Sequence, residues 1–211
     1  MEESFWQTRW EKNEIGFHQS ETNPMLTGHF KELGLAPESR IFVPLCGKSL
    51  DIHWLLKSGY RVAGAEFSRL AIVQLFEDLR LRPDILELNN IERFSAPGID
   101  IYVGDIFNLH KAVLGNVDAI YDRAALVALP EETRARYAEH LIKLTNNAPQ
   151  LTITFEYDQS QMEGPPFSVT SPEIHKLYSN NYKLKLLERA AVPRGLKGKI
   201  PAIEEAWLIK P

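Results

Sequence analysis

The amino-acid sequence predicts an α/β fold organised around a mainly parallel sheet. Strand-like and helix-like segments alternate through the middle of the chain, and two further strand-like runs close it. Such alternation is typical of parallel strands that are joined by crossover helices. Ligands of these sheets bind at the carboxyl ends of the strands, so the residues that directly follow each strand are the candidate functional residues.

Short runs rich in β-branched and aromatic residues indicate the strands, and apolar residues at helical spacing indicate the helices. The expected strands span residues 40–45, 60–65, 99–103, 116–121, 151–157, 183–189 and 202–209. The expected helices span residues 50–58, 68–79, 130–144 and 171–180. Gly59 ends the first helix and Ser68 suits the N-cap of the second. Pro130 and Pro172 suit the first turns of the other two, whereas residues 85–94 fit either a loop insertion or a short hairpin.

Length and charge point to one globular domain that is not a dedicated nucleic-acid-binding protein. The chain has 211 residues, of which 44% are hydrophobic and 25% charged, as in an ordinary globular domain. The formal net charge is −4 and the sequence pI is about 5.9. A dedicated nucleic-acid-binding protein would carry a surplus of basic residues, so this class is not expected.

Cysteine usage and hydropathy indicate the compartment. Cys46 is the single cysteine, so an intrachain disulfide cannot form, which is typical of a reducing environment. The first ten residues include Glu2 and Glu3 and lack the apolar stretch of a signal peptide. No window approaches the ~20 apolar residues of a membrane helix. We therefore expect a cytoplasmic protein that binds no membrane, and a monomer, because no heptad pattern or apolar surface stripe is visible.

The turn after the first strand reads Pro-Leu-Cys-Gly-Lys-Ser over residues 44–49. It lacks the three glycines of a dinucleotide-binding turn, and Phe42 stands where a P-loop requires its first glycine. Both phosphate-binding interpretations are therefore weak. Glu66 ends the second strand 19 residues after Gly47, where an acidic residue suits hydrogen bonds to ribose hydroxyls. The alternative is a surface carboxylate that caps the helix beginning at Ser68.

Two further turns carry candidate residues. Asp105 and Ile106 follow the third strand, where they suit an adenine ring, or else form a plain turn that leads into the core. Asp122 and Arg123 follow the fourth strand, at the expected mouth of a site, or else form a salt-bridged surface pair. The histidines show no metal-ligand spacing and a lone cysteine forms no zinc cluster, so no metal is expected. His18 is more simply explained as a structural histidine than as a base.

The chain resembles the thiopurine S-methyltransferase family, notably its bacterial members. The motifs that carry the resemblance are Phe5-Trp6, Arg9-Trp10, Gly16-Phe-His-Gln19, Asn23-Pro24, Phe42-Val-Pro-Leu-Cys-Gly-Lys-Ser49, Asp122-Arg-Ala-Ala-Leu126, Ala128-Leu-Pro130 and Gly164-Pro-Pro-Phe167. The resemblance implies the class I S-adenosylmethionine-dependent methyltransferase fold, which is Rossmann-like with a mainly parallel seven-stranded sheet flanked by helices. It also implies one methyltransferase domain over residues 1–211, in which residues 1–35 form a helical lid over the cofactor and the substrate.

The resemblance also implies roles for single residues in binding S-adenosylmethionine. Trp10, Leu45, Glu66 and Arg123 correspond to the family's contacts with this cofactor. Ile106 corresponds to a residue that lies against the adenine. The product left in this site after transfer is S-adenosylhomocysteine.

The implied substrate residues lie in three segments of the chain. Phe17 corresponds to a substrate-facing aromatic residue of the N-terminal segment. Arg123 also faces the methyl acceptor, where we expect it to stabilise the thiolate. Arg194, in the loop before the last strand, is the candidate for a second substrate arginine, and Arg189 is the alternative.

The activity implied is direct in-line methyl transfer to aromatic or heterocyclic thiols such as thiopurines. The natural acceptor is open, and selenium or tellurium species are an alternative because their anions are also soft nucleophiles. A nucleotide-dependent enzyme and a non-catalytic binding module on the same fold are further alternatives. The lack of the dinucleotide glycines argues against the first of these, and the presence of Trp10, Glu66 and Arg123 argues against the second.

Overall fold

One sheet of nine strands organises residues 3–12 and 18–211, which are the residues described by a computed structural model of the chain. The strands are β1 (Arg40–Pro44), β2 (Arg61–Glu66), β3 (Asp84–Leu88), β4 (Ile91–Ala96), β5 (Ile99–Val103), β6 (Ala119–Arg123), β7 (Gln150–Glu156), β8 (Lys183–Ala191) and β9 (Ile203–Lys210). The α-helices are α1 (Glu3–Glu11), α2 (Pro24–His29), α3 (Leu50–Lys57), α4 (Arg69–Asp78), α5 (Lys111–Leu114), α6 (Glu131–Thr145) and α7 (Ser171–Tyr178). Four short 3-10 helices are η1 (Phe30–Leu33), η2 (Ile106–Asn108), η3 (Leu126–Ala128) and η4 (Gln159–Gln161).

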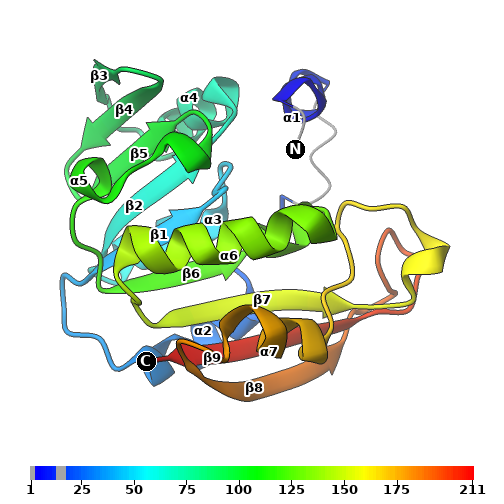
Figure 1. Cartoon of the computed structure of the whole chain (residues 1–211). Coiled ribbons are helices and arrows are strands. Elements are labelled where there is room, and N and C mark those ends of the chain that lie inside the picture. Colours follow the sequence, from blue (N-terminus) through cyan, green and yellow to red (C-terminus); the bar gives the residue numbers. More distant parts are fainter. Residues whose placement is uncertain (1–2, 13–17) are drawn as a thin grey trace.

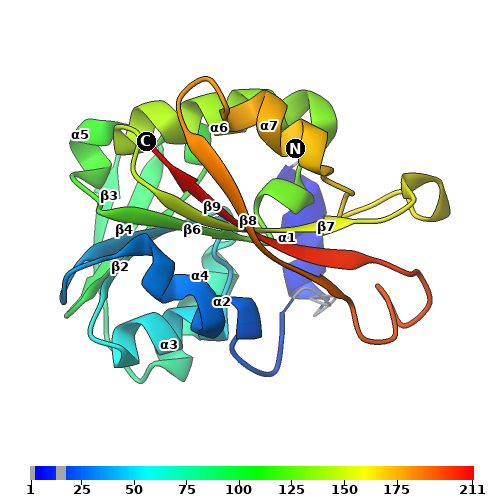
Figure 2. The same cartoon turned by 90° about the horizontal axis from the view of Figure 1, so that it is seen from below.

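Helices cover both faces of this sheet. The view from below shows α5, α6 and α7 on one face and α2, α3 and α4 on the other (Figure 2). Helix α1 stands apart from these layers and contacts α4 (Figure 1). The arrangement confirms the predicted α/β fold with a helix layer on each side of the sheet.

The strand order places a parallel centre between antiparallel edges. The order across the sheet is β3-β4-β5-β2-β1-β6-β7-β9-β8. The central strands β5, β2, β1, β6 and β7 pair in parallel. Antiparallel pairs extend the sheet at both edges, with β9 and β8 beyond β7 and with β4 and β3 beyond β5. Seven strands were expected, and all seven are present in addition to the β3–β4 pair.

The ambiguous segment forms a hairpin. Leu88 of β3 pairs with Ile91 of β4, so Asn89 and Asn90 make the connecting turn. Asn89 has a φ of 54°, a conformation that asparagine tolerates better than most residues and that tight hairpin turns require. The hairpin lies on the open edge of β5, where it lengthens the sheet without adding a crossover helix.

Two apolar cores, one on each face, hold the layers together. On the α6 face the largest fully buried side chains include Tyr137 and Tyr178. On the α3 face Ile52, Leu55 and Phe76 are almost completely buried. Burial of side chains of this size provides roughly 1.5–3 kcal/mol each, so these cores fix the positions of the strand ends.

The predicted helix starts agree with the structure, and several strand boundaries differ by one to three residues, most of all in β6. The Ser68 hydroxyl caps α4 by accepting from the Ala71 backbone N–H at 3.3 Å. Pro130 stands at the N-cap of α6. Strand β6 begins later than predicted and includes Asp122 and Arg123, because β6 continues its parallel pairing with β7 through these two residues.

The N-terminal part of the chain contributes to the core as well as to a separate helix. The Asn23 side chain caps α2 by accepting from the Met25 backbone N–H at 2.8 Å. Leu26 of α2 and Phe30 of η1 are buried in the core on the α3 face. Among the described residues, no helix has both the length and the apolar character that crossing a membrane requires.

Candidate functional site

The carboxyl ends of four parallel strands bring the predicted residues to one edge of the sheet. Pro44 ends β1 and pairs with Ala65, next to Glu66 at the end of β2. Glu66 in turn pairs with Val103 at the end of β5. Arg123 ends β6, which pairs with the other side of β1. Segments that are far apart in the sequence therefore meet here, as expected for an α/β sheet.

The turn after β1 is held tightly against β2. Leu45 has a φ of 46° and Gly47 a φ of 51°, so the backbone reverses within three residues. The Cys46 backbone N–H donates to the Ala65 carbonyl at 3.0 Å. The Ser49 hydroxyl then accepts from the Asp51 backbone N–H at 3.2 Å and starts α3. The half-buried side chain of Leu45, at this turn, packs against the core on the α6 face.

Glu66 is buried and connects two turns. One carboxylate oxygen accepts from the Gly47 backbone N–H at 2.8 Å. The other oxygen accepts from the backbone N–H groups of Phe67 and Ser68, at 2.9 and 2.8 Å. Burial raises the pKa of the Glu66 carboxyl, and these three hydrogen bonds offset part of the effect. With 7% of its surface exposed, Glu66 is not the surface carboxylate of the alternative prediction, although it does bind the start of the next helix.

The turn after β5 presents an apolar side chain and a capping carboxylate. The Asp105 carboxylate accepts from the Phe107 backbone N–H at 3.0 Å and caps η2. Ile106 is buried and packs with the core on the α6 face. The preceding Gly104 has no room for a side chain, since a Cβ atom would lie 2.8 Å from a side-chain carbon of Ile91. These contacts fit the prediction of a turn that leads into the core, and they leave the adenine role of Ile106 a prediction.

Asp122 and Arg123 do not form a salt-bridged surface pair, so that alternative is wrong. Asp122 is fully buried, and its carboxylate accepts from the Tyr137 hydroxyl at 2.8 Å and from the Leu126 backbone N–H at 3.2 Å. Burial raises the pKa of Asp122 to about 6. Arg123 points elsewhere, and one of its guanidinium nitrogens lies 3.9 Å from the Asp51 carboxylate. Successive residues of a strand face opposite sides of the sheet, which separates the two side chains.

Sequence reasoning missed the acidic group that faces Arg123. Asp51 lies on α3 with 1% of its surface exposed, and it accepts from the Tyr121 hydroxyl at 2.9 Å. Its second oxygen accepts from the Asn23 backbone N–H at 2.8 Å. The Asn23 side chain donates to Glu204 of β9 at 3.1 Å. A carboxylate on the first turn of a helix, directly after the candidate cofactor turn, was the available clue.

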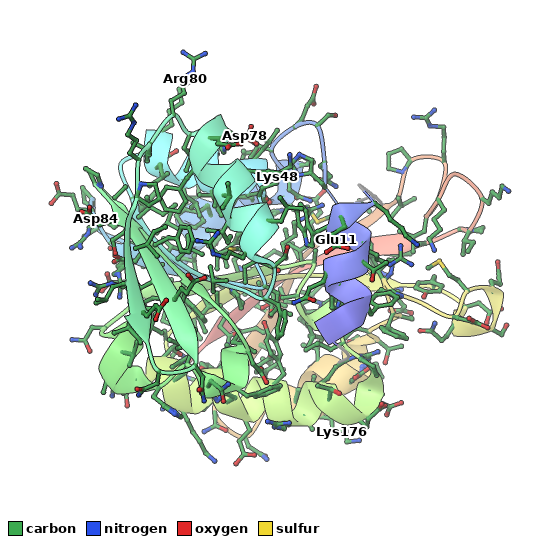
Figure 3. All side chains as sticks on the ribbon, turned by 90° about the horizontal axis from the view of Figure 1, so that it is seen from above. Glu11, Lys48, Asp78, Arg80, Asp84 and Lys176 are labelled. Atoms are coloured by element: carbon green, nitrogen blue, oxygen red, sulfur yellow. The ribbon has the colours of Figure 1, made fainter. Side chains whose placement is uncertain are left out.

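Helix α1 brings an aromatic residue toward this edge. Trp10 is buried, with 4% of its surface exposed, and α1 contacts α4. Figure 3 shows the two helices from above, with Glu11 labelled on α1 and with Lys48 and Asp78 labelled nearby. Phe17, the predicted substrate-facing aromatic residue, lies outside the described residues.

The two candidate arginines near the last strand have different surroundings. Arg189 of β8 is held by two carboxylates, Glu156 at 3.2 Å and Glu205 at 3.0 Å. Arg194 lies in the loop between β8 and β9 and helps to line a hollow of about 650 Å³. Tyr157, directly after the carboxyl end of β7, lines the same hollow. Arg189 is not among the residues that line this hollow, so Arg194 stays the candidate substrate arginine and Arg189 the alternative.

The Gly-Pro-Pro-Phe loop is tied to the segment that follows β6. The Phe167 backbone N–H donates to the Val127 carbonyl at 2.6 Å. The Tyr157 hydroxyl donates to the Pro166 carbonyl at 2.6 Å. The guanidinium of Arg134 lies 5.8 Å from the centre of the Phe167 ring. This loop is thus a fixed wall between the end of β7 and the segment after β6.

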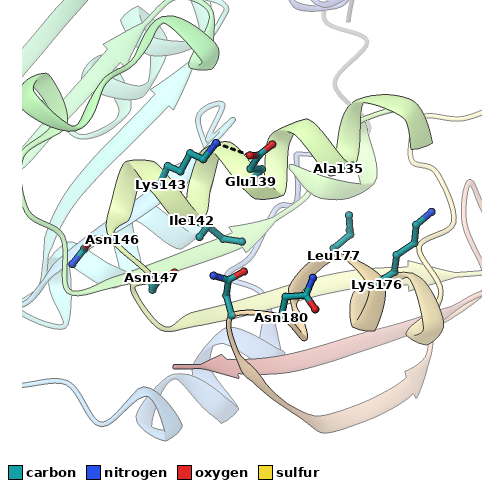
Figure 4. A pocket seen from close by; sticks show the side chains of 10 residues that line it. Ala135, Glu139, Ile142, Lys143, Asn146, Asn147, Lys176, Leu177 and Asn180 are labelled. Carbon is teal, nitrogen blue, oxygen red and sulfur yellow. Dashed lines mark hydrogen bonds and ion pairs between the residues drawn. The ribbon is translucent and has the colours of Figure 1, made fainter.

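Another hollow, of about 610 Å³, lies between α6 and α7 (Figure 4). Asn146 and Asn147 line it and precede the amino end of β7. The hollow therefore runs along the helices on one face of the sheet, and its end at Asn146 and Asn147 lies at the opposite edge from the strand ends that carry Glu66 and Arg123. None of the described residues that line it was predicted to belong to the site.

Burial shifts the pKa values of both His18 and Cys46. Burial, with Lys48 as the next cause, lowers the pKa of the His18 imidazole. Burial raises the pKa of the Cys46 thiol well above its usual range, which opposes formation of a thiolate. Among residues 3–12 and 18–211, no cluster of three or more histidine, cysteine or acidic side chains could hold a metal ion.

Comparison with known proteins agrees with this geometry. The model of the thiopurine S-methyltransferase family matches residues 1–207. A protein of Xanthobacter autotrophicus named thiopurine S-methyltransferase is 52% identical over 211 residues, which is 100% of this chain and 99% of that protein. A protein of the same name from Teredinibacter turnerae is 54% identical and covers 98% of this chain and 96% of its own length.

Solved structures resemble the chain in fold. The 1,6-didemethyltoxoflavin-N1-methyltransferase of Burkholderia thailandensis, with bound 1,6-didemethyltoxoflavin and S-adenosylhomocysteine, aligns with a TM-score of 0.68 and 14% identity over 99% of this chain and 87% of its own. An S-adenosylmethionine-dependent methyltransferase of Methanosarcina mazei aligns with a TM-score of 0.63 and 14% identity over 90% of this chain and 98% of its own. The fold is therefore that of S-adenosylmethionine-dependent methyltransferases. The match of the family model to residues 1–207 and the 52% identity to a named relative show that the chain belongs to the thiopurine S-methyltransferase family.

Proposed function

We propose that this chain transfers the methyl group of S-adenosylmethionine to the thiolate of a small aromatic or heterocyclic thiol, such as a thiopurine. The observation that carries the proposal is the meeting of Glu66 and Arg123 at the carboxyl edge of a methyltransferase sheet. One of these side chains is anionic and the other cationic, and each has a distinct task in such a reaction. The named activity of the bacterial relatives supports the same assignment.

The residues at this edge fit a nucleoside that carries no phosphate. A carboxylate offers about four acceptor positions, and Glu66 uses three of them for backbone N–H groups. One position remains for a ribose hydroxyl. Ile106 offers an apolar surface to an adenine ring, while Leu45 and Trp10 offer apolar surface to the remainder of the cofactor. The single glycine of the Leu45–Gly47 turn suits a ligand without a pyrophosphate group.

Arg123 prepares the acceptor. When bound, S-adenosylmethionine supplies an electrophilic methyl group carried on a sulfonium. The Arg123 guanidinium, on a side chain that is 10% exposed, favours the thiolate form of the acceptor by charge and by hydrogen bonding. It also fixes the direction from which the sulfur approaches, and such alignment supplies much of the rate of a two-reactant step.

Exclusion of water from the site contributes further to the rate of methyl transfer. A cation and an anion react to give neutral products, so a site that is poor in water favours the transition state. The proposed cover is the segment of residues 1–35, which carries Trp10 and Phe17. Residues 24–33 of this segment also belong to the core, so the part before Asn23 forms the cover over the cofactor and the acceptor. Phe17 is proposed to contact the acceptor.

Substitution of Arg123 tests the proposed reaction. Wild-type protein is expected to bind S-adenosylhomocysteine in isothermal titration and to methylate an aromatic thiol with labelled S-adenosylmethionine. Arg123→Ala should lower kcat/KM by roughly 10²- to 10³-fold, comparable with the loss of one preorganised charge-stabilising donor. Arg123→Lys keeps the charge but loses the forked geometry and should recover only part of the rate. Full kcat/KM in Arg123→Ala would refute this role.

The hollow beside Arg194 gives a second test. Arg194→Ala is expected to raise KM for the thiol while the affinity for S-adenosylhomocysteine stays unchanged. Arg189→Ala should instead lower the melting temperature, because it leaves the buried Glu205 without its cationic partner. An increase of KM in Arg189→Ala alone would reverse the assignment.

The choice of acceptor, the assembly and the compartment need their own measurements. A screen with thiols, selenols and the oxyanions of selenium and tellurium separates thiol methylation from the alternative substrates.

We further propose a cytoplasmic monomer that binds no nucleic acid, on the basis of the single cysteine, the net charge of −4 and the absence of a heptad pattern. Light scattering after size-exclusion chromatography checks the monomer.

A further inference from the structure

Asp51 occupies a position that joins three parts of the chain. It lies on α3, between the N-terminal segment and β6, and almost none of its surface is exposed. Its carboxylate accepts from the Asn23 backbone N–H at 2.8 Å and from the Tyr121 hydroxyl at 2.9 Å. The oxygen that binds Tyr121 also lies 3.9 Å from a guanidinium nitrogen of Arg123.

The charge of Asp51 is directed at Arg123 in surroundings from which most water is excluded. The Asp51 side chain is 2% exposed and the Arg123 side chain 10% exposed. Interactions between charges are stronger in such surroundings than in water. A buried carboxylate without hydrogen bonds is costly, and the bonds from Asn23 and Tyr121 keep this carboxylate satisfied and fixed in direction.

A second carboxylate, that of Glu204, is linked to Asp51 through Asn23. The Asn23 side-chain amide donates to Glu204 at 3.1 Å, while its backbone N–H donates to Asp51 at 2.8 Å. Burial raises the pKa of the Glu204 carboxyl, and the charge of Arg123 offsets part of this rise, so Arg123 acts on Glu204 as well. Asn23 therefore links both carboxylates, and through them the end of the N-terminal segment is connected to the residue proposed to bind the acceptor.

We propose that Asp51 is a positioning residue that holds the Arg123 guanidinium in the orientation needed for methyl transfer. The inference rests on the proposed function of Arg123 and assigns Asp51 no contact with the acceptor. Tyr121 and Asn23 fix the carboxylate, and the carboxylate fixes the arginine. Asp51 should therefore affect the reaction only while Arg123 is present.

A double-mutant cycle tests this dependence. Asp51→Asn preserves the shape of the side chain and one acceptor oxygen, and it should lower kcat/KM for the thiol by about tenfold at saturating S-adenosylmethionine. In an Arg123→Ala background the same substitution should change kcat/KM by less than about twofold. Asp100→Asn is the matched control, because it removes a carboxylate that pairs with Arg40 at 3.0 Å near the starts of β1 and β5. This control should leave kcat/KM unchanged in both backgrounds.

A readout that needs no activity keeps the inference separate from the proposed function. In spectra of protein labelled with ¹⁵N-arginine, the side-chain signal of Arg123 is identified by its loss in Arg123→Ala. Asp51→Asn should shift or broaden this signal, Tyr121→Phe should shift it less, and Asp100→Asn should leave it in place. Tyr121→Phe also serves if Asp51→Asn does not fold, and an unmoved signal in the folded variants would overturn the inference.

The combined outcomes identify which statement fails. If Asp51→Asn shifts the Arg123 signal but the wild-type protein methylates no thiol, the proposed function is refuted, while the role of Asp51 in holding Arg123 stands. Equal losses from Asp51→Asn with and without Arg123 would show that Asp51 acts through the fold in general, and would overturn the inference while methyl transfer stands.

Discussion

The buried carboxyl group of Asp122 should make the protein less stable as the pH rises from about 4 to about 7. Asp122 is fully buried and its pKa is raised from 3.8 to about 6, with burial as the largest cause. Between these two values the folded protein binds more protons than the unfolded chain. Raising the pH through this range therefore favours unfolding. Asp122→Asn removes the titration while its side-chain oxygen still accepts from the Leu126 backbone N–H.

The size of the effect follows from the pKa. Each pKa unit corresponds to about 1.4 kcal/mol, so the difference between 3.8 and about 6 corresponds to about 3 kcal/mol when fully developed. The free energy of unfolding of Asp122→Asn, minus that of the wild type, should accordingly grow by about 2–3 kcal/mol between pH 4 and pH 7. Taking this difference cancels the titration of the other groups, which both proteins share.

Urea titrations followed by circular dichroism at several pH values measure these free energies. Tyr137→Phe is the companion variant, because it removes the hydroxyl that donates to Asp122 at 2.8 Å and that lowers its pKa. In this variant the pH-dependent loss of stability should extend to a higher pH than in the wild type. A difference between Asp122→Asn and the wild type that stays constant from pH 4 to pH 7, or that shrinks, would refute the reasoning.

Two further predictions concern the strand that carries Glu66. Glu66→Gln should weaken binding of S-adenosylhomocysteine in isothermal titration by roughly tenfold or more, since the charge is lost and an amide nitrogen must then face either the Gly47 N–H or the N–H groups of Phe67 and Ser68; unchanged affinity would contradict the role of Glu66. Gly64→Ala should destabilise the fold by about 1–3 kcal/mol in urea unfolding, because the new Cβ would lie 2.5 Å from a side-chain carbon of Ile101. Gly28→Ala, which meets nothing within 4 Å, is its control, and equal stability of these two variants would contradict the packing argument.

The part of the site that sequence reasoning located consists of residues tied to strand ends. Glu66 was placed correctly because a run of strand residues stops at it, 19 residues after Gly47. Its hydrogen bonds follow less directly from the sequence, since the bond to Gly47 exists only because β1 and β2 pair side by side. Arg123 was placed at the mouth of the site, but its charged neighbour was sought at Asp122, whose side chain lies in the core.

The acidic neighbour of Arg123 could not be derived from local pattern. Asp51 looks like an ordinary acidic residue in the first turn of a helix, a place where carboxylates are common. Its hydrogen-bond partner Tyr121 is 70 residues away in the sequence, and Asn23 is 28 residues away in the other direction. No periodicity links these three positions, because each belongs to a different element.

The fold class, the alternation of elements and the strand ends that carry the candidate site were predictable from the sequence. These features depend on the spacing of apolar residues and on caps such as Ser68, which act within about one turn of chain. Packing in three dimensions was needed to establish that Asp122 is buried, that Asp51 faces Arg123 and that residues 84–96 form an edge hairpin. Burial and ion pairing depend on which elements pack together, and packing joins residues whose separation along the chain carries no local pattern.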